Sequence, residues 1–155
     1  RFRLPNNPQQ EHTNKLEYVG MFLFCSYDRI IGTMRLLLVC SANVQRSVTG
    51  AGLFGGCPGI ETESAGTDPE EGRTPVSQDL IDWADIVFVM DEEGDGHASF
   101  IRSNFNVSDK KIYDLGIKDV YFTHQPELKS LIIRGVSKYV DLKPCMDKLI
   151  ESIKK

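Results

Sequence analysis

Two continuous apolar runs stand out along the chain. Residues 36–40 read LLLVC and residues 85–90 read DIVFVM, and each run ends at a polar loop. Runs of this kind are typical of parallel strands that are buried on both faces. Two shorter segments, 60–64 and 111–115, have the composition of further strands. The pattern therefore predicts four strands.

Segments with helical spacing lie between and after these strands. They cover residues 47–54, 76–84, 97–105, 126–142 and 144–155. Ser77 suits the N-cap of the second segment, whereas Gly50 and Gly52 each weaken the first by about 1 kcal/mol relative to Ala. Alternation of strand and helix predicts an α/β fold, a small doubly wound four-stranded parallel sheet with helices on both faces. Such a sheet has its active site at the carboxyl ends of the strands.

The first 33 residues differ in texture from the rest. They begin with a polar stretch that holds two prolines and continue with an apolar stretch that does not alternate, while Met34 comes directly before the first strand. We expect 1–33 to be an N-terminal extension of uncertain structure and 34–155 to be the domain proper. Asp28, Arg29 and Arg35 interrupt the apolar stretch 19–40, which argues against a membrane span.

Composition narrows the classes of function. The chain has 155 residues, 18 basic and 22 acidic side chains and a formal net charge of −4, which disfavours nucleic-acid binding and membrane-surface binding. Four cysteines without a CxxC pair indicate neither a zinc ribbon nor a disulfide scaffold, so Cys57 and Cys145 are interpreted as inert thiols in a reducing, cytoplasmic compartment. The three histidines are dispersed, and no metal site is predicted. Residues 91–96, DEEGDG, are predicted to be a solvated turn.

The chemistry is concentrated between the first strand and the first helix. Cys40 ends the strand, five residues intervene, and Arg46 and Ser47 follow. A short loop before a helix N-terminus directs backbone N–H groups inward and forms a nest for a tetrahedral oxyanion. Arg46 adds a planar fork of donors for two phosphate oxygens. The positive surroundings favour the thiolate of Cys40, with Ser47 donating to the sulfur and Asn43 bracing the loop.

Three motifs then occur in order: VCSANVQRS at 39–47, ESAGT at 63–67 and WADIVFVMD at 83–91. Together they resemble the low-molecular-weight protein tyrosine phosphatase family, and in particular a compact prokaryotic branch of it, over about residues 34–132. The resemblance implies a four-stranded parallel sheet flanked by helices, a phosphocysteine intermediate, and neither a metal nor another cofactor.

The resemblance also implies roles for individual residues. Cys40 would be the nucleophile, Arg46 would hold the phosphoryl oxygens, and an aspartate after the fourth strand would be the general acid. Aligning PEL at 126–128 with the family's motif places that acid at Asp119, with Asp114 as the alternative. The rest of the loop would bind the substrate phosphate: Ser41, Ala42, Asn43, Val44, Gln45 and Ser47.

Several positions depart from the family pattern. Val48 and Lys118 stand where the family has proline, Gln125 replaces an aspartate, and Gln45 stands where many members have a second cysteine. These changes leave the phosphate cradle intact but alter the loop that carries the acid.

The predicted function is hydrolysis of phosphotyrosine in proteins or peptides, with release of inorganic phosphate. Two alternatives remain open, a pseudophosphatase that binds phosphate or phosphoproteins without turnover and a phosphoserine phosphatase of the same fold. Arsenate reduction is disfavoured because residues 81–95 contain no cysteine.

Overall fold

The computed structural model describes residues 32–155. The predicted extension 1–33 therefore lies almost entirely outside the described residues, and its structure stays a prediction. The first strand, β1 (Met34–Cys40), begins at the residue expected to open the domain. Within 32–155, no helix combines the length and the apolar character needed to cross a membrane.

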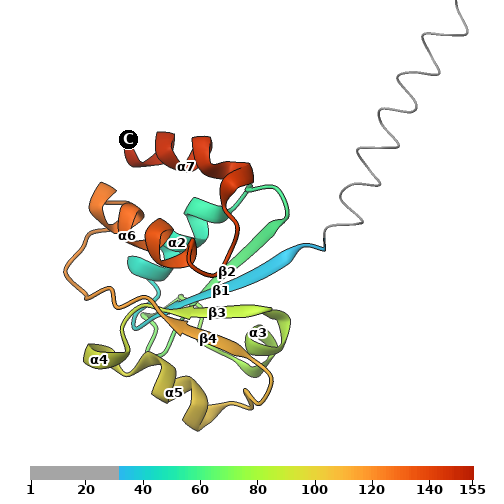
Figure 1. Ribbon diagram of the computed structural model, residues 1–155. Helices are drawn as coiled ribbons and strands as arrows, with labels where there is room; N and C mark the ends of the chain where they lie inside the picture. Colours follow the sequence, from blue (N-terminus) through green and yellow to red (C-terminus); the bar gives the residue numbers. More distant parts are fainter. Residues whose placement is uncertain (1–31) are drawn as a thin grey trace, which may run out of the picture. The chain divides into compact units, whose positions relative to one another are not determined.

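The sheet has four parallel strands in the order β2-β1-β3-β4 (Figure 1). Besides β1, these are β2 (Ile60–Gly66), β3 (Ile86–Val89) and β4 (Lys111–Asp114). The order means that β1 lies between the strands that follow it in sequence. The predicted α/β class and four-stranded parallel sheet are confirmed.

Helices cover both faces of this sheet (Figure 1). On one face lie α2 (Arg46–Phe54), α6 (Pro126–Val136) and α7 (Met146–Ile153), and on the other lie α3 (Gln78–Trp83) and α5 (His97–Asn104). Ser77 caps α3 as predicted, since its hydroxyl accepts a hydrogen bond from the backbone N–H of Leu80.

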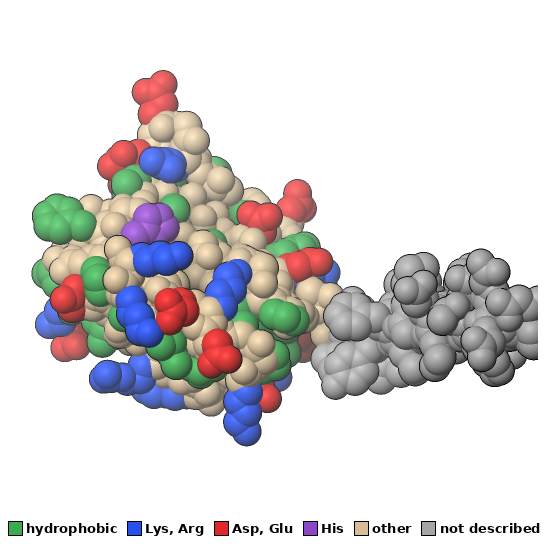
Figure 2. Space-filling model, turned by 90° about the horizontal axis from the view of Figure 1, so that it is seen from above, with side chains coloured by type: hydrophobic (Ala, Val, Ile, Leu, Met, Phe, Trp, Pro, Cys, Tyr) green, Lys and Arg blue, Asp and Glu red, His purple; other side chains and the backbone are tan. Residues whose placement is uncertain are grey.

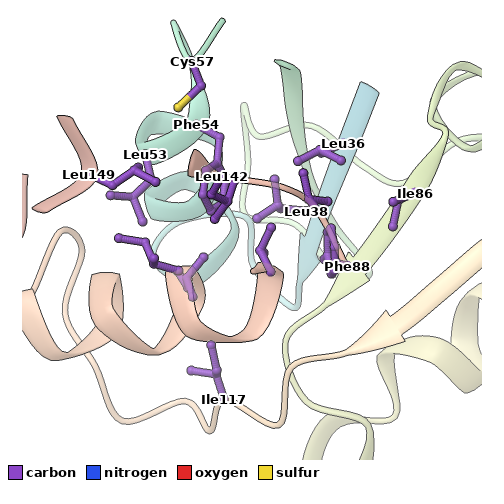
Figure 3. Close-up of a cluster of buried hydrophobic side chains, with 14 of the residues drawn as sticks. Leu36, Leu38, Leu53, Phe54, Cys57, Ile86, Phe88, Ile117, Leu142 and Leu149 are labelled. Carbon is purple, nitrogen blue, oxygen red and sulfur yellow. The ribbon is translucent and has the colours of Figure 1, made fainter. Parts of the chain in front are cut away.

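Alternation along the central strands divides the core into two clusters. Leu36 and Leu38 of β1 join Phe88 of β3 under α2, α6 and α7 (Figure 3). Leu37 and Val39 point to the opposite cluster, under α3 and α5. The apolar run of β1 is continuous because each of its two faces is covered by helices.

Gly50 shows why α2 carries glycine despite the cost in helix propensity. A Cβ at Gly50 would meet the side chain of Leu38 inside van der Waals contact. The absence of a side chain thus lets α2 lie close on β1, next to the loop that precedes the helix.

The largest difference between predicted and observed boundaries lies near the C-terminus. The helix expected over 126–142 ends at Val136, and the last helix is preceded by a short 3-10 turn, η1 (Lys143–Cys145).

Residues 91–96 are not a simple solvated turn. They form a short helix, α4 (Glu92–Asp95), in which the buried Asp91 is the N-cap and accepts from the N–H of Gly94.

The interpretation of Cys57 and Cys145 as free thiols is wrong in this structure, where the two form a disulfide with a Cα–Cα distance of 5.4 Å. The bridge joins the turn after α2 to the residue before α7, across 88 residues of sequence. Its partners could not be paired from spacing alone, because their proximity arises only when α7 folds back against α2.

The face of the described residues that Figure 2 shows carries side chains of both charges. In Figure 2, acidic, basic and apolar side chains are interspersed over the face that is shown. This mixed pattern agrees with the modest net charge of the sequence.

Candidate active site

The candidate site lies at the carboxyl ends of the strands. In the sheet register Cys40 pairs with Gly66, and Val39 pairs with Val89. The loops after β1, β2, β3 and β4 therefore begin at one edge of the sheet, which is where a doubly wound fold binds its ligands.

A buried hydrogen-bond chain holds the nucleophile candidate. The sulfur of Cys40 lies 2.9 Å from the hydroxyl of Ser47, and that hydroxyl lies 2.9 Å from Oδ1 of Asn43. A hydroxyl has only one proton, so Ser47 donates to Asn43 while Cys40 is a thiol and is free to turn to the sulfur when Cys40 is a thiolate. Ser47 is thus placed to stabilise the anionic sulfur.

Asn43 sets the shape of the 40–47 loop. Its φ is 53°, a left-handed backbone conformation that asparagine adopts more readily than most residues. Both polar atoms of its side chain form hydrogen bonds. Oδ1 accepts one from the hydroxyl of Ser47, and Nδ2 donates one to the backbone oxygen of Ser64 at 3.5 Å. These contacts fit the bracing role that was predicted for it.

The small residues of the ESAGT motif support the loop from behind. A Cβ at Gly66 would collide with the backbone oxygen of Ser41, so only glycine lets β2 approach the loop this closely. The next residue, Thr67, donates its backbone N–H to the carbonyl of Cys40 at 3.0 Å. The ESAGT motif therefore packs against the 40–47 loop and stabilises its conformation.

Arg46 is 1% exposed and binds three residues on two segments, the one after β3 and the one after β4. Its Nη1 donates to the backbone oxygen of Ile117 at 2.9 Å, and its Nη2 lies 2.8 Å from a carboxylate oxygen of Asp95. Its Nε lies 3.2 Å from Oδ1 of Asp119. A buried guanidinium with this many partners is fixed in orientation.

The two acid candidates occupy different places. Asp119 lines the cavity with Cys40 and keeps a side chain that is 57% exposed. Asp114 instead accepts hydrogen bonds from the backbone N–H groups of Glu92 and Gly116, so it organises the end of β4. Of the two, only Asp119 lines the cavity that contains the sulfur.

The cavity itself has a volume of about 250 Å³. Its lining combines the predicted catalytic residues with half of the predicted binding residues and one residue that the sequence analysis did not identify: Cys40, Ala42, Val44, Gln45, Arg46, Asp119 and Glu70. The other predicted binding residues, Ser41, Asn43 and Ser47, do not line it. They lie behind the loop or beneath the sulfur, where they hold its conformation.

His97 is a further residue that the sequence analysis did not place at the site. It is fully buried, its Nδ1 accepts from the backbone N–H of Asp91, and its Nε2 lies 2.9 Å from the hydroxyl of Ser41. The backbone donor fixes the tautomer with the proton on Nε2, which donates to Ser41. Burial and, secondly, the charge of Arg46 lower the pKa of His97, so the neutral ring is favoured.

The loop between β4 and α6 is fastened to the start of α2. Thr123 donates its hydroxyl to the backbone oxygen of Val44, and the N–H of His124 donates to the hydroxyl of Thr49. Tyr121 packs against the core, whereas Phe122 is 76% exposed. Neither ring is among the residues that line the cavity.

The start of α2 adds unpaired donors to this site. The helix has no side-chain cap at its N-terminus and no acidic residue in its first turn. The first N–H groups of such a helix have no partner within the helix and attract an anion.

Within residues 32–155, no group of three or more His, Cys, Asp or Glu side chains is arranged to hold a metal ion.

The chain was compared with protein-family models, with curated proteins and with solved structures, and only the solved structures gave matches. No protein-family model and no curated protein matches the chain. Among solved structures, the YwlE arginine phosphatase from Geobacillus stearothermophilus is 24% identical, with a TM-score of 0.54 over 76% of this chain and 96% of that one. A low-molecular-weight protein tyrosine phosphatase from Bacillus subtilis is 20% identical, with a TM-score of 0.52 over 68% of this chain and 99% of that one.

A low-molecular-weight phosphotyrosine phosphatase from Vibrio cholerae O395 is similar to the same degree. It is 16% identical, with a TM-score of 0.52 over 76% of this chain and 97% of that one. At these identities the likeness is one of architecture. The resemblance carried by the three sequence motifs is thus confirmed for the fold, and the chain has the fold of the low-molecular-weight protein tyrosine phosphatases.

Proposed function

We propose that this protein is a phosphatase that hydrolyses phosphotyrosine in proteins through a phosphocysteine intermediate. The observation that carries the proposal is that the buried sulfur of Cys40 lines one cavity with Arg46 and Asp119, directly before the N-terminus of α2. A nucleophile, an anion ligand and an acid within one cavity are the parts that metal-independent phosphoryl transfer requires.

In the first step, the thiolate of Cys40 attacks phosphorus, an S–P bond forms and the bond from phosphorus to the tyrosine oxygen breaks. Arg46 and the N–H groups of the 40–47 loop bind the phosphoryl oxygens, whose charge they stabilise. Asp119 donates its proton to the departing phenolate oxygen, so that tyrosine leaves as a neutral phenol.

In the second step, water attacks the phosphocysteine and Asp119, now a carboxylate, accepts a proton from that water. The S–P bond breaks and inorganic phosphate is released. The electron pair returns to sulfur, where the hydroxyl of Ser47 stabilises it, because that hydroxyl lies 2.9 Å away. The enzyme thereby returns to its starting state.

One feature supports tyrosine over serine as the phosphorylated residue. Cys40 is only 3% exposed, so the longer phosphotyrosine side chain reaches the sulfur more easily than phosphoserine does.

The test is hydrolysis of an aryl phosphate by the wild type and by the Cys40→Ser variant. We expect turnover only in the wild type, together with a phosphorylated protein intermediate that can be trapped by acid quenching. Equal rates in the two proteins would sink the proposal. Matched phosphotyrosine and phosphoserine peptides then separate the main proposal from its phosphoserine alternative.

A pseudophosphatase is the second candidate, because Asp119 is paired with Arg46 and has Lys118 as its neighbour in the altered loop. Such a protein would bind inorganic phosphate or a phosphopeptide without releasing product. Normal phosphate binding with no burst of phenol in the first turnover would favour it.

The proposed partner is a phosphorylated protein, and the proposed location is the cytoplasm. The disulfide between Cys57 and Cys145 argues against a cytoplasmic location, because disulfides are uncommon in reducing compartments. The location therefore stays a prediction, and the redox state of these two cysteines in cells tests it.

A further inference from the structure

Glu70 is an unexpected member of the cavity wall. It belongs to the 67–75 loop, which hydrogen bonds through its backbone to the 40–47 loop at three points. The N–H groups of Thr67, Asp68 and Glu70 donate to the carbonyls of Cys40, Ser41 and Ala42, at 3.0, 3.0 and 3.2 Å. The backbone of Glu70 is therefore held at a fixed place beside the candidate phosphate site.

A carboxylate at this position opposes the binding of a phosphate dianion. The cation of the site, Arg46, already faces Asp95 and Asp119, and within residues 32–155 no lysine or arginine forms an ion pair with Glu70. Glu70 lines the cavity that contains Cys40 and Arg46, and like charges in one cavity repel one another. A carboxylate there is expected to disfavour a lone phosphate group and to favour a substrate that also carries a positive charge.

We propose that Glu70 selects substrates that carry a positive charge next to the transferred phosphoryl group. This inference rests on the proposed function and adds a substrate class to it. Glu70 is exposed and lines the cavity, so its carboxylate is accessible to a guanidinium or ammonium group at the mouth. Two sources of that charge are distinguishable, a Lys or Arg residue beside phosphotyrosine in a peptide and the guanidino group of phosphoarginine itself.

The chain offers a matched control in the next residue. Glu71 is also exposed and also acidic, but it does not line the cavity. The Glu70→Gln and Glu71→Gln variants remove the same charge from the same loop, so any difference between them reports the position of Glu70 rather than the net charge of the protein.

The experiment measures kcat/KM of the wild type and both variants on three phosphotyrosine peptides, with arginine, serine or glutamate beside the phosphotyrosine. The same proteins are assayed on a phosphoarginine peptide and on an aryl phosphate that carries no cationic group. We expect Glu70→Gln to lower kcat/KM for a cationic substrate by about two- to fivefold, the range of an exposed ion pair. The same variant should raise kcat/KM for the aryl phosphate without a cationic group, because the negative charge that repels its phosphate is removed. Both effects should shrink as ionic strength rises.

The pattern of losses identifies the source of the charge. A loss confined to the arginine-flanked peptide assigns the charge to a neighbouring residue, and a loss confined to phosphoarginine assigns it to the leaving group. The comparison uses the ratio of kcat/KM for substrates with a cationic group to kcat/KM for the aryl phosphate without one. The inference is overturned if Glu70→Gln and Glu71→Gln change this ratio equally, or if neither changes it.

Failure of this inference is separate from failure of the proposed function. Hydrolysis of the aryl phosphate without a cationic group by the wild type upholds the phosphatase proposal, whatever the effect of Glu70. If no substrate is turned over, the same comparison is made with dissociation constants of non-hydrolysable phosphonate peptides, arginine-flanked against serine-flanked. An equal ratio in the wild type and Glu70→Gln then overturns the inference.

Discussion

Nε of Arg46 lies 3.2 Å from Oδ1 of Asp119, so the residue proposed to bind phosphate is paired with the residue proposed to act as the acid. The other side of the guanidinium binds Asp95 and the backbone of Ile117. An incoming phosphate that uses Nε must therefore compete with Asp119 for the same donor.

This competition predicts opposite effects of one substitution on binding and on turnover. In Asp119→Asn the charge that competes for Arg46 is gone, so inorganic phosphate should inhibit at lower concentration than in the wild type. The kcat for an aryl phosphate should fall by about 10²-fold or more, because the general acid is lost. Steady-state kinetics with phosphate as a competitive inhibitor measure both quantities.

Asp114 provides the comparison for this experiment. Its carboxylate binds backbone N–H groups at the end of β4 and does not line the cavity, so Asp114→Asn should keep most of the turnover. The reverse result, a large loss in Asp114→Asn and little in Asp119→Asn, would transfer the role of acid to Asp114.

Ser47→Ala tests the hydrogen bond to the sulfur. A hydrogen bond to a charged group is worth about 1.5–3 kcal/mol, so losing it should slow alkylation of Cys40 by iodoacetate at neutral pH by roughly ten- to hundredfold. Inorganic phosphate should protect the wild-type thiol from the reagent. Ser137→Ala, at the exposed residue directly after α6, should leave the rate unchanged, because the hydroxyl of Ser137 binds only the backbone oxygen of Arg134. Equal rates in the wild type and Ser47→Ala would contradict the stabilising role.

His97 predicts a pH dependence of stability. Burial lowers the pKa of His97 in the folded protein, so the unfolded chain takes up a proton first as the pH falls. Its contribution to the free energy of unfolding is complete above about pH 6.5, the ordinary histidine pKa, and decreases as the pH falls below that value. Denaturant unfolding between pH 5 and pH 8 measures this slope.

In His97→Gln the slope between pH 6.5 and pH 5 should be smaller than in the wild type, because the titrating group is gone while an amide can still donate to Ser41. His124→Gln is the control, since that histidine is exposed. An identical slope in wild type and His97→Gln would show that His97 does not titrate differently in the two states.

The disulfide predicts a redox-dependent stability. Reduction of Cys57–Cys145 should lower the free energy of unfolding by about 2–4 kcal/mol, because the bridge closes a long loop of chain. A variant with alanine at both positions should be insensitive to reductant. Equal stability of the wild type with and without reductant would mean that the bridge does not form in solution.

Much of the fold could be predicted because its signals are local. Residues 36–40 of β1 and all of β3 are apolar, since both faces of the sheet are covered there. Ser77 caps α3 through a hydrogen bond to a residue three positions away. The short helix α4 was missed for a related reason. Its glycines and acidic residues resemble a turn, and its helical form depends on the N-cap Asp91, the one buried residue of 91–96.

The site could be predicted in part. Cys40, Arg46 and Ser47 lie within eight residues of sequence, so their common loop is visible from spacing. His97 and Glu70 reach the loop only through the tertiary fold, from the segments after β3 and β2. Nothing in the local sequence of either residue distinguishes it from a solvated polar side chain.

The burial of Arg46 has a consequence for the protein as a whole. The guanidinium of Arg46 joins α2, α4 and the loop after β4. An anion that binds this guanidinium therefore contacts a residue that links three parts of the chain that are distant in sequence. Any ligand that binds only the native state raises the melting temperature with its concentration. The melting temperature measured at increasing concentrations of phosphate or vanadate therefore reports the occupancy of the site by the anion, even in variants that have lost all turnover.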